Sequence, residues 1–155
     1  MYSEELQKIA AFMRRFYGCR EMPAPAKRDS MEHLLRKSKE VLQRELPREY
    51  TDFLRECDGL ECNGHIIYGA DDFWEKQTDY PAMAERYLTF ADYDTGWFCM
   101  KKTDASFWEL DKPSGREMRR FPCAGDMLRH ILLSAAGRAV DEDGPLPVAK
   151  TGKKR

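Results

Sequence analysis

The sequence lacks the motifs that usually mark a catalytic site. It has three histidines, and it contains no Gly-rich phosphate loop, no HExxH and no GxSxG. Cys62 and His65 are close enough in sequence to act as a nucleophile and a base. The Asn63-Gly64 pair between them explains the local sequence better, because Asn-Gly favours a tight hairpin turn. We therefore expect a protein that is not an enzyme.

Ligand patterns for a bound metal are also missing. The five cysteines include no CxxC pair, and the one CxxH spacing, Cys62 to His65, has no second ligand pair. Asp92, Asp94 and Gly96 have the spacing that opens a calcium loop, but the closing glutamate is absent, so we interpret them as a hairpin turn. We expect no metal, no cofactor and no disulfide framework. The cysteines are predicted to be reduced and mostly buried: Cys19, Cys57, Cys62, Cys99 and Cys123.

Long apolar runs are absent as well. No run is long enough to span a bilayer, and residues 1–15 lack the apolar centre of a signal peptide, so we expect a cytoplasmic protein that does not bind a membrane. The 155 residues, 42% of them hydrophobic and 34% charged, suit one globular domain. We expect this domain to cover residues 1–137 and a flexible C-terminal tail to cover residues 138–155.

Two N-terminal helices are predicted from apolar residues at helical spacing. Residues 6–17 carry the first stripe, and residues 31–42 carry the second. Asp29 and Ser30 offer an N-cap for the second helix. Pro23 and Pro25 favour an extended connection between the two helices.

Residues 46–69 change from helix to turn to strand within a short distance. Pro47 fits the first turn of a helix. The inner face of that helix is predicted to carry four residues at three- and four-residue spacing, namely Tyr50, Phe53, Leu54 and Cys57. Gly59 suits the left-handed conformation that ends a helix. Asn63-Gly64 then turns the chain into a strand at residues 65–68, which are rich in β-branched and aromatic residues.

The second half of the chain predicts a sheet followed by a helix. Aromatic-rich runs separated by turn residues lie at 87–91, 96–101, 106–110 and 117–121. An antiparallel meander is the simplest arrangement of these strands. Apolar residues at helical spacing over 126–132 predict a last amphipathic helix. The fold class is therefore α+β, an antiparallel β-sheet meander with helices packed on one face.

The motif in residues 46–69 resembles the signature of the SUKH superfamily, which includes fungal cell-wall synthesis regulators and many bacterial immunity proteins. Residues 87–90 and 121–133 resemble the next strand and the closing helix of that family, so the resemblance covers residues 46–134. It implies a SUKH-like fold and does not identify an active site. The matching signature residues are Leu46, Pro47, Tyr50, Phe53, Leu54, Gly59, Asn63, Gly64, Tyr68 and Gly69.

The charges are unevenly distributed along the chain. Residues 55–111 contain thirteen acidic and five basic residues, a balance of −8, while residues 1–54 carry +2 and residues 112–155 carry +5. The acidic segment 55–111 would attract a basic partner surface and raise the rate at which the two proteins meet. The alternative is a set of solvated acidic turns between strands, which are common in sheets.

Aromatic residues among these acids favour a protein partner. Aromatic anchors surrounded by polar side chains are typical of protein interfaces. Trp97 and Trp108 lie in predicted strands, where we expect burial rather than binding. Because the aromatics lie among acids and not among Lys and Arg, a nucleic-acid site is disfavoured. The predicted partner-binding residues are Asp71, Asp72, Trp74, Asp79, Asp92, Tyr93 and Asp94.

Two functions are compatible with this surface. The resemblance implies an immunity protein that binds a basic toxin domain, often a nuclease, and occludes its active site. The fungal relatives imply instead an intracellular scaffold or regulatory adaptor that binds an endogenous protein.

Overall fold

The structure is a computed structural model that describes residues 2–16 and 22–143. Within these ranges six helices and six strands follow one another along the chain. The helices are α1 (Ser3–Phe16), α2 (Arg28–Leu42), α3 (Arg48–Leu54), α4 (Phe73–Gln77), α5 (Pro81–Ala84) and α6 (Ala124–Asp143). The strands are β1 (Leu60–Cys62), β2 (His65–Ile67), β3 (Tyr87–Tyr93), β4 (Gly96–Lys101), β5 (Phe107–Asp111) and β6 (Glu117–Phe121). The predicted α+β class is confirmed.

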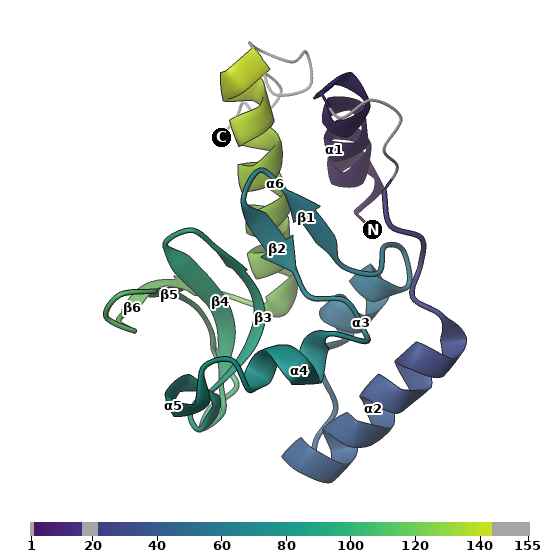
Figure 1. Ribbon diagram of the computed structural model, residues 1–155. Helices are drawn as coiled ribbons and strands as arrows, with labels where there is room; N and C mark the ends of the chain where they lie inside the picture. Colours follow the sequence, from purple (N-terminus) through teal and green to yellow (C-terminus); the bar gives the residue numbers. More distant parts are fainter. Residues whose placement is uncertain (1, 17–21, 144–155) are drawn as a thin grey trace.

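The six strands form one antiparallel sheet in the order β1-β2-β3-β4-β5-β6, so the predicted meander is also confirmed (Figure 1). Strand β1 was not predicted. It pairs with β2 across the Asn63-Gly64 turn, where both residues have positive φ, 51° and 81°. Two consecutive positive φ angles define the hairpin turn that Asn-Gly favours.

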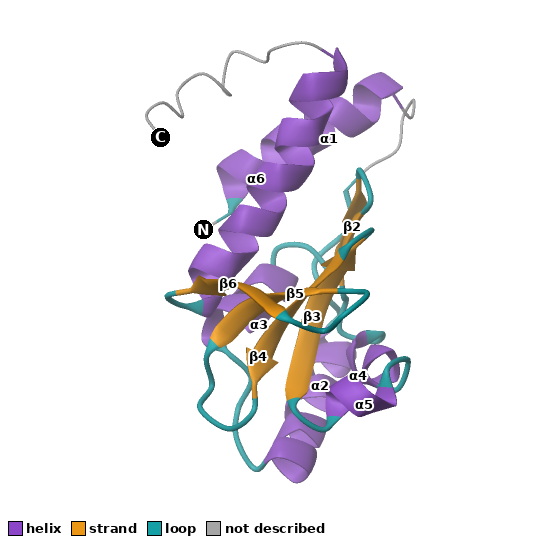
Figure 2. Cartoon of the chain, turned by 90° about the vertical axis from the view of Figure 1, so that its left-hand side faces the viewer, coloured by secondary structure: helices purple, strands orange, loops and turns teal. Residues whose placement is uncertain are grey.

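Most of the helices cover one face of the sheet. Helix α6 packs along α1 and against α3, and Figure 2 shows the pair α1 and α6 side by side on that face. The main core lies between these helices and the sheet and includes Phe53, Leu54, Phe98, Leu128 and Ile131.

The opposite face carries a smaller apolar cluster. Tyr87, Trp97, Cys99 and Leu110 alternate with main-core residues along the strands, and Met83 of α5 packs against them. The prediction that all helices lie on one face is therefore wrong for α5. Its four residues were not predicted as a helix.

Residues 46–69 have the structural roles that their residue types indicate. Tyr50, Phe53 and Leu54 of α3 are fully buried, and the Tyr50 hydroxyl donates a hydrogen bond to the Tyr68 carbonyl oxygen. Gly59 has φ +83°, and a Cβ atom there would lie 2.8 Å from the backbone nitrogen of Gly69. A side chain at position 59 would therefore separate the two loops that meet there.

Two predicted helix boundaries differ from the structure. Helix α2 begins at Arg28, and its N-cap residue Lys27 makes no side-chain capping bond, so Asp29 and Ser30 are not the cap. Asp29 lies in the first turn instead, where a carboxylate interacts favourably with the helix dipole. Helix α6 is assigned to Asp143, past Gly137, where we expected the tail to begin. The rest of the predicted tail, 144–155, lies outside the described residues.

None of the helices in the described ranges combines the length and apolar composition that a membrane span requires.

Candidate functional site

Helix α4 is fixed to the sheet by the buried side chain of Gln77. Its Nε2 donates to the carbonyl oxygens of Thr89 at 2.7 Å and Phe73 at 2.9 Å, and the backbone nitrogen of Thr89 donates to its Oε1 at 3.0 Å. Strand β2 ends at Ile67 and its register with β3 includes no partner for Thr89. The Gln77 amide therefore makes the bonds that a strand residue would make to β3.

Phe73 anchors the other end of the same helix. Its side chain is fully buried, with ring centroids 5.5 Å from Tyr50 and 5.6 Å from Phe90. These contacts tie α4 to the signature helix α3 and to β3. Because Phe73 and Gln77 face inward, the remaining surface of α4 faces solvent.

The exposed side of α4 and its flanks is acidic. Asp71, Asp72, Glu75 and Asp79 are all exposed. In the part of the chain that the structure describes, none of the four forms a salt bridge. The neighbouring Lys76 places its Nζ 5.6 Å from the ring of Tyr68. We call Asp71, Asp72, Trp74, Glu75 and Asp79 the α4 surface. Its carboxylates are available to a partner.

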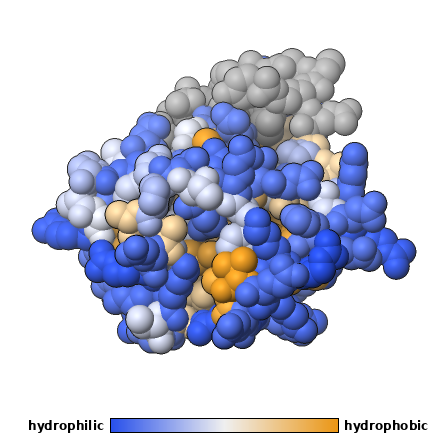
Figure 3. Space-filling view, turned by 60° about the horizontal axis from the view of Figure 1, so that its bottom comes forward, coloured by the Kyte–Doolittle hydropathy of each residue, from blue (hydrophilic) through white to orange (hydrophobic). Residues whose placement is uncertain are grey.

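An apolar pocket adjoins the α4 surface. Its volume is about 440 Å³, and it lies between the end of α2, α4, α5 and the start of β3. Figure 3, which brings the lower end of Figure 1 forward, shows an apolar patch surrounded by hydrophilic side chains. Helices α2, α4 and α5 lie at that end of the molecule. The wall of the pocket includes Lys37, Val41, Trp74, Pro81, Ala84 and Leu88. We call it the Trp74 pocket.

Trp74 connects the pocket to the acidic residues. The ring is half-buried and lies edge-on to Phe73, with centroids 5.1 Å apart. Its Nε1 is buried and has no hydrogen-bond partner among the described residues. A buried donor without an acceptor costs about 1–3 kcal/mol. Half-buried tryptophan beside unpaired charge is an arrangement typical of interface anchors.

The other half of the predicted partner-binding set lies at the far end of β3. Asp92 and Tyr93 end the strand, and Asp94 is exposed in the turn to β4, which confirms the predicted hairpin turn. In Figure 1, α4 and α5 lie at one end of β3 and this turn at the other. The structure therefore separates the predicted residues into two groups.

Asp92 is bound within the protein. The Tyr68 hydroxyl donates to its Oδ2 at 2.5 Å, and Lys112 Nζ lies 3.4 Å from its Oδ1. Burial and this hydrogen bond raise the pKa of Tyr68 well above its ordinary value. Only 14% of the Asp92 side chain is exposed. A carboxylate that is buried and paired in this way supports the fold and is poorly placed to meet a partner.

Tyr93 is likewise used inside the protein. Its ring stacks on His65 with centroids 5.1 Å apart, and on Phe98 at 5.5 Å. Its hydroxyl donates to Glu109 Oε2 at 2.5 Å. Desolvation, followed by this hydrogen bond, raises the pKa of Tyr93. We call Asp92, Tyr93 and Glu109 the β3-end cluster.

Glu109 extends this cluster toward α6. Its Oε1 lies 3.7 Å from Arg119 Nε and 4.0 Å from His130 Nε2. Burial, and then the charge of Arg119, lowers the pKa of His130, so the imidazole is neutral at pH 7. No sequence pattern predicts that Glu109, Arg119 and His130 meet. Their approach depends on strand pairing and on how α6 packs, which no local pattern encodes.

The cysteines have the character of core residues. Cys57, Cys62 and Cys99 are buried and Cys123 is half-buried, as predicted; Cys19 lies outside the described residues. Burial raises the pKa of Cys57 and of Cys99 to about 12. Their thiols are therefore protonated at neutral pH and are poor nucleophiles. Over the described ranges no group of three possible metal ligands occurs.

The two strand tryptophans differ in burial. Trp97 is buried, as predicted, and its ring lies 4.9 Å from Tyr80. Trp108 is only half-buried. Lys101 Nζ lies 5.5 Å and Arg120 Cζ 5.6 Å from the centroid of its ring, so both cations make cation–π contacts with it.

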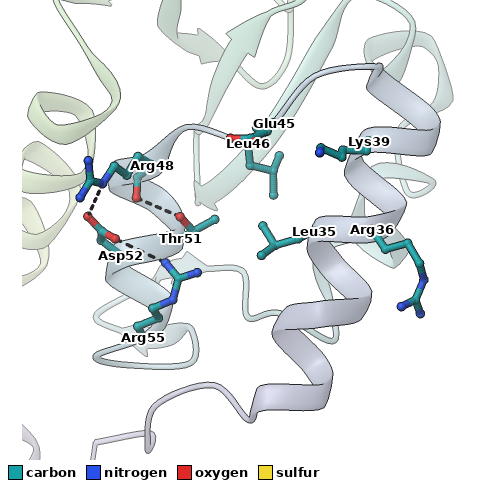
Figure 4. Close-up of a pocket in the computed structure, with 9 residues that line it drawn as sticks. All are labelled: Leu35, Arg36, Lys39, Glu45, Leu46, Arg48, Thr51, Asp52 and Arg55. Atoms are coloured by element: carbon teal, nitrogen blue, oxygen red, sulfur yellow. Dashed lines mark hydrogen bonds and ion pairs between the residues drawn. The ribbon is translucent and has the colours of Figure 1, made fainter.

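A second pocket, with more basic than acidic residues in its lining, lies between α2 and α3. Its volume is about 500 Å³, and Leu35 and Leu46 contribute apolar surface to it (Figure 4). Asp52 binds two arginines there, with Arg48 Nε at 3.7 Å and Arg55 Nη1 at 3.4 Å. Figure 4 shows both arginines directed toward Asp52. We call it the α2–α3 cleft. Arg48 and Arg55 both pair with Asp52, so less of their charge remains for a ligand.

No family model matches this chain, and no curated protein was found to match it. The SUKH resemblance of residues 46–134 therefore stays a prediction from the sequence.

Proposed function

We propose that this chain is a non-catalytic protein-binding domain, and specifically an immunity protein that neutralises a basic toxin domain by covering its active site with the α4 surface. One observation carries the proposal. Four exposed carboxylates that form no salt bridge with any described residue lie on and beside α4, and Trp74 of the same helix lines an apolar pocket. Apolar contact at the centre of an interface with charge around it is the arrangement that protein partners use.

The two parts of this surface act at different stages of binding. Unpaired surface charges attract the partner over distances of about 8–10 Å and raise the association rate. In the basic cleft of a nuclease, carboxylates occupy the place of substrate phosphates. Contact at the Trp74 pocket excludes water and slows dissociation. The toxin is then inhibited because its cleft is covered.

The resemblance to the SUKH superfamily supports the choice of a toxin as partner, since many of its members are immunity proteins. The alternative remains an adaptor for an endogenous protein, which would use the same surface. Binding to a toxin that is encoded beside this gene would distinguish the immunity function from the adaptor function.

The test compares two charge-reversal variants against that neighbouring toxin domain. Asp71→Lys with Asp79→Lys changes the α4 surface, and Glu61→Lys with Asp94→Lys changes exposed acids elsewhere by the same net charge. Stopped-flow association is measured at low and high salt after each variant is shown to melt like the wild type. We expect about tenfold slower association at low salt for the α4 variant, and a change of less than about twofold for the control.

Two outcomes contradict the proposal. If both variants slow association equally, the net charge of the protein determines the association rate and the α4 surface has no specific role. A wild-type protein that binds the toxin without inhibiting it, or does not bind it at all, excludes the immunity function.

A further inference from the structure

We infer that the Trp74 pocket receives a large apolar side chain from the partner, on a segment where that side chain is flanked by lysine or arginine. This inference rests on the proposed function and specifies the chemistry of the segment that the α4 surface recognises. It follows from the composition of the pocket wall and from the charges that border it.

The size and lining of the pocket select an apolar group. Its volume of about 440 Å³ lies within the range of about 300–1,000 Å³ that is common for ligand pockets. Val41 on its wall is 53% exposed, which makes it one of four large apolar side chains that are exposed in the described ranges. An apolar side chain seated there removes Val41 and the Trp74 ring from water together.

The two cations on the wall are already bound within the protein. Lys37 Nζ lies 5.9 Å from the centroid of the Trp74 ring. Lys102 Nζ donates a hydrogen bond to the Ala84 carbonyl oxygen at 2.5 Å. Both lysines therefore form part of the wall, and each ammonium has one contact within the protein.

The unpaired charges beside the pocket are negative. Thr78 lines the pocket, and Asp79 follows it in the chain; Glu75 precedes Thr78 by less than one helical turn. Neither carboxylate forms a salt bridge within residues 2–16 and 22–143. A basic residue next to the apolar side chain would complement them.

Three peptides test this inference with the full-length protein. The first is acetyl-Gly-Arg-Phe-Arg-Gly-amide, the second replaces Phe by Ala, and the third replaces both Arg by Glu. Binding is followed by the three tryptophan indole N–H signals in a nitrogen–proton NMR spectrum, with the Trp74 signal identified from Trp74→Phe. We expect the first peptide to shift the Trp74 signal in a saturable way and to leave the buried Trp97 signal in place. The other two peptides should bind at least tenfold more weakly.

Matched surface variants locate the peptide. Val41→Lys introduces a cation at the pocket, and Leu133→Lys makes the same kind of change on α6, where Leu133 is 47% exposed. Neither position is buried, so both variants should fold. Val41→Lys should weaken the first peptide at least fivefold, and Leu133→Lys should not.

The outcomes separate this inference from the proposed function. Equal affinity for the first two peptides, or tighter binding of the glutamate peptide, overturns the inference. If the neighbouring toxin binds Val41→Lys and wild type equally, the pocket is outside the interface. The inference then fails, and the immunity function rests on the carboxylates of the α4 surface alone. If the first peptide binds as expected but the toxin does not bind, the pocket chemistry stands and the immunity function fails.

Discussion

The two ends of β3 carry the same kinds of residue and use them differently. At the α4 surface, the exposed aspartates form no salt bridge with the residues that the structure describes. At the β3-end cluster, Asp92 is held by Tyr68 and Lys112, and Tyr93 by Glu109. An acid and an aromatic ring side by side in a sequence therefore indicate a binding surface only where the rest of the chain leaves their polar atoms unpartnered.

The physical reason for this difference is solvent exposure. An exposed carboxylate keeps its hydration and needs no partner in the protein. A carboxylate that is mostly buried, as in Asp92 and Glu109, loses its water and must be paired. Substitutions should therefore affect stability at the β3-end cluster and binding at the α4 surface.

The largest expected effect is from Tyr93→Ala. This change removes the stacking on His65 and Phe98 and leaves Glu109 Oε2 without its donor, so we expect a loss of about 3 kcal/mol in the free energy of unfolding. Urea unfolding followed by circular dichroism measures it. Tyr93→Phe keeps the ring and should cost only about 1 kcal/mol. If Tyr93→Ala is as stable as the wild type, the β3-end cluster contributes little to stability and resembles the α4 surface in this respect.

A smaller difference is expected between two aspartate deletions. Asp92→Ala leaves the buried Tyr68 hydroxyl without its acceptor, and should reduce the free energy of unfolding by about 2 kcal/mol. Asp79→Ala removes an exposed carboxylate without a partner and should stay within about 0.5 kcal/mol of the wild type. Equal costs for the two variants, measured by the same urea titrations, would remove the distinction between the two regions.

The smallest effect concerns pH. Burial lowers the pKa of His130 below its ordinary value of 6.5, so on acidification the unfolded chain takes up the proton before the folded one. The contribution of His130 to stability is present above pH 6.5 and is lost as the pH falls toward the folded pKa. We expect the urea midpoint to fall between pH 7.5 and 5.5.

A matched pair of variants tests the origin of this pH dependence. His130→Gln should flatten the change in the urea midpoint, whereas His33→Gln, at an exposed position on α2, should leave it as in the wild type. An unchanged slope in His130→Gln would assign the pH dependence to other groups.

Much of the sheet could be predicted because its signals are local. The bounds of β4 and β6 equal the predicted runs 96–101 and 117–121, and the Asn63-Gly64 turn has the backbone that its residue types favour. The elements that were not predicted are short. Strand β1 has three residues, α5 has four and α4 has five, which is too few for a periodic pattern. Helix α4 is fixed instead by Gln77 bonding to Thr89, twelve residues away.

The candidate site was predictable only in part, for a related reason. The density of acids and aromatics from 71 to 94 is visible in the sequence. The pocket beside Trp74 is not, because Val41 and Lys37 reach it from α2 and Lys102 from the turn after β4. Whether Asp92 was available also depended on Tyr68 and Lys112, which are 24 and 20 residues away.

The side chain of Gln77 has a consequence for the thermodynamics of binding. A five-residue helix has no stability of its own, yet the two hydrogen bonds between this amide and Thr89 hold α4 against β3 before any partner arrives. The acidic residues that it displays are thus preorganised, and little backbone conformational entropy is lost when a complex forms. Association at this surface should then proceed by docking of two ordered bodies, without folding of α4 coupled to binding.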